Sequence, residues 1–226
     1  MKFAFIEALG PTERDAVRGT MVRKRFEKGA VVFHDAEVGD CLYLVGAGRF
    51  AVVLSTADGT ESIVRVVQPG EAFGELALVH HDNRRVGRVV AIQAGWADVL
   101  YRRDFDDLRD RFPAVDRMLV MALAERIKQM NEQAVEAMLG PDQRVLRRLA
   151  ALADAYRGEP IRMSQEDIAR LANTVRQTAN RVLAAAEAAG AIRRERGVIH
   201  VVDAGKLQSL IEARRGCGEP GAPRRR

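Results

Sequence analysis

The stretch MSQEDIARLANTVRQTANRVLAAAEAAG, residues 163–190, decides how the rest of the chain is interpreted. Apolar residues recur in it at steps of three and four, in two segments that meet at Asn173. Asn tolerates the left-handed backbone of a tight turn better than most residues do. The stretch therefore predicts two helices joined by a tight turn, and the second has the layout of a helix that enters the DNA major groove.

Capping signals predict where these two helices begin and end. Ser164, with Asp167 three residues later, is close to a capping box at the start of the first helix. Thr174 is placed to cap the second helix, and Gln177 completes a second capping box. Gly190 is a good helix terminator. The second helix is therefore expected to run from just after Thr174 to Gly190.

The residues that follow, AIRRERGVIHVVD at 191–203, predict two short strands hinged at residues 195–197. Two helices and this hairpin make a winged helix-turn-helix. A helical hairpin inside an unrelated core is the alternative, but the wing and the polar residue types favour DNA binding, because Arg, Gln and Asn hydrogen-bond guanine and adenine edges. The polar side of the second helix carries Arg176, Gln177, Asn180 and Arg181.

Length and composition set the broad class of protein. The chain of 226 residues is long enough for two domains, and 47% of its residues are hydrophobic, as in ordinary globular proteins. It contains no apolar run long enough to span a membrane, and its N-terminus does not have the pattern of a signal peptide. Cys41 and Cys217 are far apart; Cys41 lies in an apolar run and is expected to be a buried thiol. These features favour a cytoplasmic protein without a membrane partner.

The net charge of +5 is unevenly distributed along the chain. Residues 1–140 carry 19 Lys and Arg against 21 Asp and Glu, a balance of −2. Residues 141–226 carry 17 against 10, a balance of +7. The positive part is the part with the predicted helix-turn-helix, as binding to DNA phosphates requires.

The N-terminal part has a different texture. After a short helical lead-in over residues 1–19, apolar runs are separated by the turn signals Gly46-Ala47-Gly48, Asp58-Gly59 and Pro69-Gly70. Asp-Gly between apolar runs is a strong hairpin signal, and short strands at this spacing indicate an antiparallel sandwich or barrel. The predicted strands are residues 31–33, 41–45, 50–54, 63–67, 89–92 and 97–101.

From Asp104 onward the pattern becomes helical. One apolar stripe follows steps of three and four, and Gly140-Pro141 ends it. A stripe of this length between two domains predicts packing against the same helix of a second subunit. The Gly- and Pro-rich tail from Gly216 is expected to be disordered. The stripe consists of Leu119, Leu123, Ile127, Met130, Ala134 and Ala137.

Four sequence pieces together resemble the Crp/Fnr family of bacterial transcription factors. They are Gly39-Asp40, Gly46-x-Gly48, PGEAFGELAL at 69–78, and SQEDIARLANTVRQTANRVL at 164–183. The resemblance covers residues 20–210 and implies an α+β protein: an N-terminal cyclic-nucleotide-binding-type antiparallel β-roll, a long dimerisation helix and a C-terminal winged helix-turn-helix. The corresponding domains are 1–103, 104–139 and 140–210, followed by the tail 211–226.

The resemblance also implies partners and DNA contacts. Family members are typically homodimers that bind a two-fold symmetric operator, here through the helix at 113–138, and RNA polymerase is the expected partner if this protein is an activator. Arg176, Gln177 and Arg181 match the base-reading positions, and Arg193 and Arg194 are placed in the wing to contact phosphates. The predicted DNA-binding set is completed by Asn180, Ser164 and Thr174.

The segment GELAL at 74–78 with Arg85 matches the phosphate-binding cassette of cyclic-nucleotide domains. In such a cassette backbone N–H groups near Gly74 face the cyclic phosphate, Glu75 accepts a hydrogen bond from the ribose, and Arg85 pairs with the phosphate charge. The candidate effector-binding residues are Gly74, Glu75, Leu76, Arg85, Val86, Met130 and Asn131.

Two departures from the cyclic-AMP pattern bear on the effector. Cyclic-AMP binders place Ser or Thr after the arginine, whereas this chain has Val86, which cannot donate a hydrogen bond. The positions on the long helix that carry hydroxyl groups in cyclic-AMP responders fall near Met130 and Asn131. Cyclic AMP is therefore the favoured nucleotide but a doubtful effector. The alternative is a structural salt bridge between Glu75 and Arg85 in a roll that binds no ligand.

Other classes of function have less support in the sequence. His34, His80, His81 and His200 are too scattered for a cupin-like metal site, and no nucleophile–base arrangement suggests an enzyme. We predict no metal and no catalytic residues. A sensor that acts through a protein partner instead of DNA is the remaining alternative, and the winged helix-turn-helix argues against it.

Overall fold

A computed structural model describes residues 4–7 and 9–213 of the chain. It divides into two compact units, residues 1–134 and 135–226. The tail predicted to be disordered from residue 211 begins too early, because residues 211–213 belong to the helix α9 Ala204–Ala213 and Ile211 is buried. The rest of the predicted tail, with Cys217, lies outside the described residues. None of the described helices is long and apolar enough to cross a membrane.

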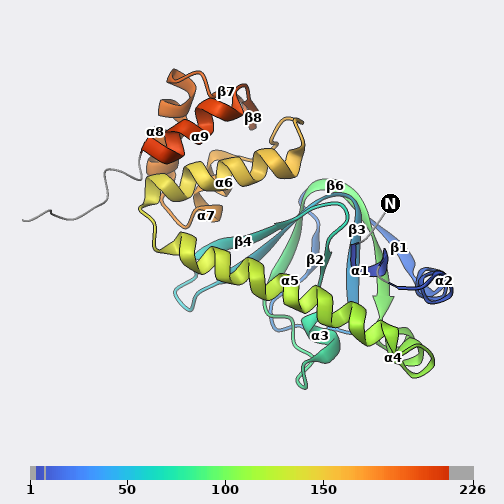
Figure 1. The fold of residues 1–226 in the computed structure, drawn as a ribbon. Helices are drawn as coiled ribbons and strands as arrows, with labels where there is room; N and C mark the ends of the chain where they lie inside the picture. Colours follow the sequence, from blue (N-terminus) through green and yellow to red (C-terminus); the bar gives the residue numbers. More distant parts are fainter. Residues whose placement is uncertain (1–3, 8, 214–226) are drawn as a thin grey trace, which may run out of the picture. The chain divides into compact units, whose positions relative to one another are not determined.

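The N-terminal unit is built on an antiparallel sheet that curls into a roll (Figure 1). Its main path runs in the order β1-β6-β3-β4, with β2 paired to β6 and β5 paired to β3. The strands are β1 Val22–Phe26, β2 Val31–Phe33, β3 Cys41–Ser55, β4 Glu61–Val67, β5 Ala72–Phe73 and β6 Arg88–Tyr101. The short helices α1 Ala4–Glu7, α2 Pro11–Thr20 and α3 Leu76–Val79 complete the roll.

The antiparallel β architecture is confirmed, but one predicted turn is wrong, and the strands predicted at 89–92 and 97–101 form the single strand β6. Gly46-Ala47-Gly48 does not separate two strands; it lies inside the 15-residue β3, where the register against β6 shifts on both sides of Ala47. A side chain at Gly46 would collide with the Trp96 ring, and Gly48 has a φ of +79°. The glycines therefore let a long strand bend past β6 as a bulge, which an apolar run interrupted by Gly does not distinguish from a turn.

Aromatic side chains fill the inside of the roll. The rings of Tyr43 and Phe73 stack with centroids 4.9 Å apart, and Phe33, Phe50 and Phe26 surround them. Cys41 belongs to the same cluster and is buried, as predicted. Burial raises the pKa of its thiol.

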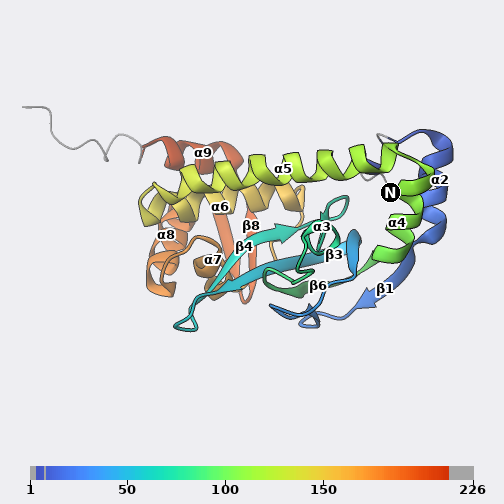
Figure 2. The ribbon, with the colours of Figure 1, turned by 90° about the horizontal axis from the view of Figure 1, so that it is seen from below.

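Two helices follow β6: α4 Arg102–Arg111 and the 24-residue α5 Ala114–Ala137. The two helices are separate because Pro113 lies between them: proline has no backbone N–H and would leave one helical hydrogen bond unmade. Figure 2 shows α5 as one uninterrupted helix that begins beside α4 and runs along the β-roll. A long helix is therefore present, but the helix predicted over 104–139 is divided in two at Pro113. Leu119 of the predicted dimer stripe is buried in the core of the N-terminal unit instead of being left for a partner. Helix α5 ends at Ala137, and Pro141 occupies the first turn of the next helix with Gly140 as its N-cap.

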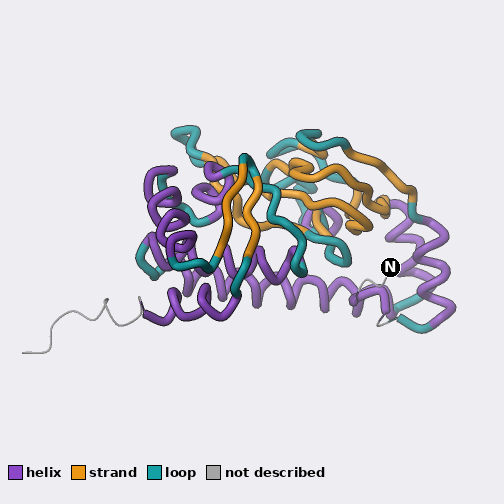
Figure 3. The backbone as a smooth tube through the Cα atoms, turned by 90° about the horizontal axis from the view of Figure 1, so that it is seen from above, coloured by secondary structure: helices purple, strands orange, loops and turns teal. Residues whose placement is uncertain are grey.

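The C-terminal unit contains the predicted helix-turn-helix and wing. Its elements are α6 Pro141–Tyr156, α7 Gln165–Leu171, α8 Arg176–Ala188, β7 Ile192–Glu195, β8 Val198–Val201 and α9 Ala204–Ala213. In Figure 3 the two wing strands form a narrow hairpin beside these helices. Asn173 has the left-handed backbone expected of the turn, with a φ of +46°, and Gly190 ends α8 with a φ of +71°.

The two predicted capping boxes have different outcomes. Ser164 caps α7: its hydroxyl accepts from the Asp167 N–H, and the Asp167 carboxylate accepts from the Ser164 N–H. The box at Thr174 is wrong, because α8 begins one residue later with extended Val175 as its N-cap and no side-chain cap. The N–H of Thr174 donates instead to the carbonyl of Ala169, which closes the turn.

Candidate functional site

The second helix of the helix-turn-helix, α8, presents its first turn to solvent. Its buried side chains are Ala179, Val182, Leu183 and Ala186, which anchor one face. Arg176 and Gln177, at the start of the helix, are exposed. Within the described part of the chain neither has a hydrogen-bond or ion-pair partner, so all their donors are available to an external acceptor.

The other two predicted residues on α8 are placed differently. Arg181 is exposed, but its guanidinium donates from Nη1 to Oδ2 of Asp142 over 2.9 Å and from Nη2 to the other carboxylate oxygen. The hydrogen bonds to Asp142 raise the pKa of Arg181. Asn180 is half-buried, and its amide oxygen is buried without a partner among the described residues. Only Arg176 and Gln177 of the predicted set are therefore both exposed and unengaged.

The two predicted wing residues, Arg193 and Arg194, differ in their contacts. Arg193 is exposed, with a 3.4 Å contact to Glu195. Arg194 is held by Glu187 of α8: its backbone N–H and its Nε donate to the two carboxylate oxygens, each over 2.8 Å. These bonds lower the pKa of Glu187, first through the backbone N–H and then through the guanidinium. Arg194 thus fastens the wing to α8.

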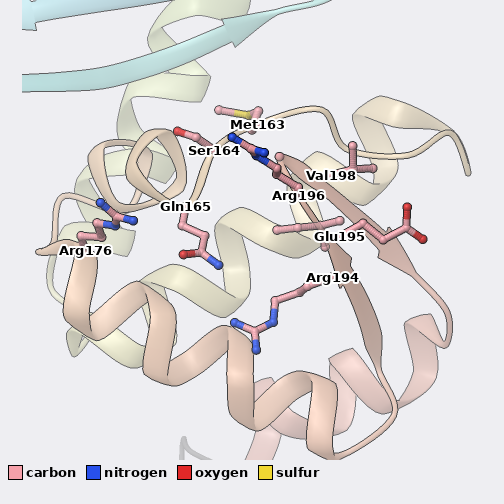
Figure 4. Close-up of a pocket in the computed structure, with 10 residues that line it drawn as sticks. Met163, Ser164, Gln165, Arg176, Arg194, Glu195, Arg196 and Val198 are labelled. Carbon is pink, nitrogen blue, oxygen red and sulfur yellow. The ribbon is translucent and has the colours of Figure 1, made fainter.

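A hollow of about 270 Å³ separates the wing from the start of α8 (Figure 4). Its lining brings the predicted residues Ser164, Arg176 and Arg194 together with Gln165 and Arg196, which were not predicted. Figure 4 shows Arg176 from α8 and Arg196 from the wing on either side of Gln165. The charge of Arg196, at the hairpin turn before Gly197, could have identified it from the sequence.

Arg144, near the start of α6, was not predicted and holds the turn of the helix-turn-helix. Its guanidinium donates three hydrogen bonds to carbonyl groups: to Leu139 and Ala172 over 2.8 Å and to Asn173 over 2.7 Å. One side chain thereby satisfies carbonyls left free at the end of α7 and after α5. The orientation of α8 depends on this turn.

The predicted cassette at 74–78 lies beside Arg85 in the β-roll, but the hydrogen-bond partners of Arg85 differ from those expected. Gly74 has a φ of +85°, and a side chain there would collide with Arg85. Arg85 is buried; it donates to the carbonyl of Gly74 over 3.0 Å and to Sγ of Cys41, and lies over the Phe33 ring. Within the described residues no ion pair joins it to Glu75, so the alternative of a structural salt bridge between them is wrong.

A pocket of about 350 Å³ lies between the roll and α5. Glu75 is the predicted residue that lines it. Arg126 contributes a guanidinium whose Nη1 is buried without a partner in the described chain. Burial lowers the pKa of Arg126, and the neighbouring charge of Arg65 adds to that effect. The full lining is Arg65, Gly70, Glu71, Ala72, Glu75, Met121, Ala122, Glu125, Arg126 and Gln129.

The remaining predicted effector residues do not line this pocket. Leu76 and Met130 are exposed, and Val86 has 63% of its surface exposed. Asn131 is exposed as well. Arg126 was not predicted from the sequence, because a single Arg on a long helix carries no signal of its own. Among the described residues, no group of His, Cys, Asp and Glu side chains could hold a metal ion.

Comparison with known proteins matches both units. Residues 23–112 match the family model of the cyclic nucleotide-binding domain, and residues 143–210 match that of the Crp-like helix-turn-helix domain. The chain is 29% identical over 203 residues to the cyclic AMP receptor protein of Thermus thermophilus, covering 89% of this chain and 94% of that protein. It is 28% identical over 194 residues to a CRP-like cAMP-activated global transcriptional regulator of Mycobacterium tuberculosis, covering 80% and 84% of the two chains.

Solved structures show the same architecture. The catabolite activator protein of Thermus thermophilus aligns over 92% of this chain and 98% of its own, with a TM-score of 0.53 and 28% identity. The c-di-GMP responsive global regulator CLP of Xanthomonas campestris aligns over 85% and 99%, with a TM-score of 0.74 and 20% identity. At 20% identity, the similarity to CLP supports a shared fold only.

Proposed function

Because the chain belongs to the Crp/Fnr family of transcription regulators, we propose that it acts as a homodimer on a two-fold symmetric DNA operator. The chain is a sequence-specific DNA-binding regulator with a cyclic-nucleotide-type roll and a Crp-like helix-turn-helix. The observation that carries the operator proposal is the pair of unengaged side chains, Arg176 and Gln177, on the exposed first turn of α8. RNA polymerase is the further partner if the protein activates transcription.

In this proposal the residues near α8 have three roles: some contact bases, some contact phosphates, and some make contacts within the protein. Arg176 and Gln177 read base edges in the major groove, where Arg bonds guanine O6 and N7 in a bidentate manner. Arg193 and Arg196 in the wing, with Ser164 and Thr174 near the turn, contact phosphates, which fix register without carrying sequence information. Arg194 and Asn180 act within the protein, since both lie half-buried against it.

We assign a separate role to each of three segments of the chain. Residues 1–103 form the sensor roll, 104–139 the connector and dimer helix, and 140–210 the DNA-binding domain. For a two-fold dimer through 113–138, we expect an operator with two half-sites about one helical turn apart.

The pocket beside α5 supports an effector with an anionic group. Arg126 is half-buried, and its buried Nη1 has no partner among the described residues, so an anion there would recover the free energy that the unpaired donor costs. We assign Arg126 to that anion and Glu75 to a ligand hydroxyl, the two groups that a cyclic nucleotide offers. Two relatives are named for cyclic AMP, which makes it the first nucleotide to test, although Val86 supplies no donor.

The test is a binding titration on a pool of random DNA duplexes, with and without cyclic AMP, followed by sequencing of the bound fraction. A palindrome enriched only with cyclic AMP supports both the operator and the nucleotide. The same palindrome in both arms supports the operator and rejects cyclic AMP as its switch. A pool without any enriched sequence in either arm counts against the operator proposal.

A further inference from the structure

Helix α5 has two faces of different character. One face packs on its own roll: Met118 and Leu119 are buried, Ala122 and Arg126 line the pocket, and the amide of Gln133 donates to the carbonyl of Val64 over 2.8 Å. These residues recur at helical spacing. This face is therefore occupied within the chain.

The opposite face repeats in steps of four and three and is left exposed. Val120 and Ile127, seven residues apart, expose 62% and 60% of their surfaces. In heptad terms they take d positions, and flanking Met130 and Val135 are exposed at g and e. The seam consists of Val120, Ala124, Ile127, Asn131 and Ala134.

Asn131 is the one polar residue among these five seam positions and takes an a position. Asn131 does not line the pocket of its own chain, and its position on α5 lies on the face turned away from Arg126. An exposed apolar stripe with a single central Asn is the pattern by which parallel two-stranded coiled coils set their register.

We propose that Asn131 lies on the two-fold axis of the α5–α5 pair and hydrogen-bonds Asn131 of the partner subunit, fixing register and limiting the assembly to two strands. This inference rests on the proposed homodimer. A second copy is the occupant because a seam with this repeat is complementary to itself: in a parallel pair each a residue meets its own counterpart. The amide offers a donor and an acceptor, so two identical side chains satisfy each other. A slipped register would leave both amides unpaired against Ile or Ala.

Disulfide cross-linking tests the position of Asn131. The variant Asn131→Cys in a Cys217→Ser background keeps buried Cys41 as its only native thiol. Mild oxidation is expected to link it into dimers at least about tenfold faster than the neighbouring control Glu132→Cys, because disulfides require Cβ atoms about 4 Å apart. Equal rates at 131 and 132 in a protein that sediments as a dimer would reject the axial position while leaving the homodimer intact. A monomer at all concentrations would reject the homodimer itself.

A second variant tests the role of the amide. Asn131→Val is expected to lower the dimer dissociation constant about tenfold, because a polar a residue costs stability, and to add species larger than the dimer in sedimentation equilibrium. The exposed variant Glu132→Ala is the matched control and should leave both readouts unchanged. If Asn131→Val forms a tighter dimer but no larger species, Asn131 lies in the interface but does not limit the assembly to two strands.

Discussion

The guanidinium of Arg181 on α8 is bound through both terminal nitrogens to the carboxylate of Asp142 in the first turn of α6. Arg176, on the same helix, has no such partner in the described chain. Two arginines at predicted base-reading positions thus differ in availability, and Arg181 must leave Asp142 before it can bind a base with its full fork.

We therefore expect Asp142→Asn to strengthen DNA binding by roughly threefold, since an exposed ion pair is weak and easily exchanged. The substitution also removes a negative charge from the neighbourhood of the phosphates. Fluorescence anisotropy on the selected operator measures the effect, with the exposed pair variant Glu166→Gln as control. Weaker binding by Asp142→Asn would show instead that Asp142 orients Arg181 for its base.

Arg176→Ala is expected to abolish preference at one base position in each half-site, at a cost of about 1–3 kcal/mol for the preferred base. Arg196→Ala is the matched comparison: removal of a wing charge should weaken binding to every sequence alike and reduce the salt dependence. Sequencing of duplexes selected by each variant separates the two effects. An unchanged base preference in Arg176→Ala would contradict its role as a reader.

What could be predicted from the sequence depends on how far apart the interacting residues lie. The Ser164 box was predictable because its two partners are three residues apart, and the left-handed Asn173 because the turn selects its residue type. Asp142 is 39 residues from Arg181, and Ala172 is 28 residues from Arg144. Such pairs follow from how helices pack, which no local pattern encodes. The same holds for Arg126, whose position over the pocket depends on how α5 lies on the roll.

The Glu187–Arg194 contact gives the wing a dependence on pH. The pKa of Glu187 is lowered in the folded protein, so the contact stabilises the fold above the ordinary carboxyl pKa of 4.5 and loses that effect as the pH falls through the lowered value. Glu187→Gln should therefore lower the Tm at pH 7 and converge with the parent protein at strongly acidic pH. Thermal unfolding from pH 7 to pH 3 measures this. A constant difference in Tm over that range would exclude ionisation of Glu187 as the cause.

Nη1 of Arg126, which is buried without a partner among the described residues, predicts that the pocket binds an anion through this side chain. Arg126→Ala should weaken cyclic-AMP binding at least about tenfold, because the anion loses its charged partner. The neighbouring Lys128→Ala, exposed on α5 and outside the pocket lining, should bind as the parent does. Isothermal titration calorimetry on the full chain provides the comparison. Parent-like affinity in Arg126→Ala would move the anion site elsewhere in the roll, and a parent protein that binds no cyclic AMP would reject this nucleotide.

Arg144 donates to three carbonyl groups at once. Its removal should lower both the free energy of unfolding and the affinity for the operator. Each hydrogen bond from a charged group contributes about 1.5–3 kcal/mol, and carbonyls left without a donor add to the loss. Arg144→Ala is expected to lower the free energy of unfolding by at least about 2 kcal/mol in urea titrations. Exposed Arg162→Ala controls for loss of a positive charge in the same unit. Arg144→Lys, which keeps the charge but not the planar fork, should recover little of the operator affinity if the turn needs all three bonds. Full recovery by lysine would show that Arg144 acts on DNA through its charge alone.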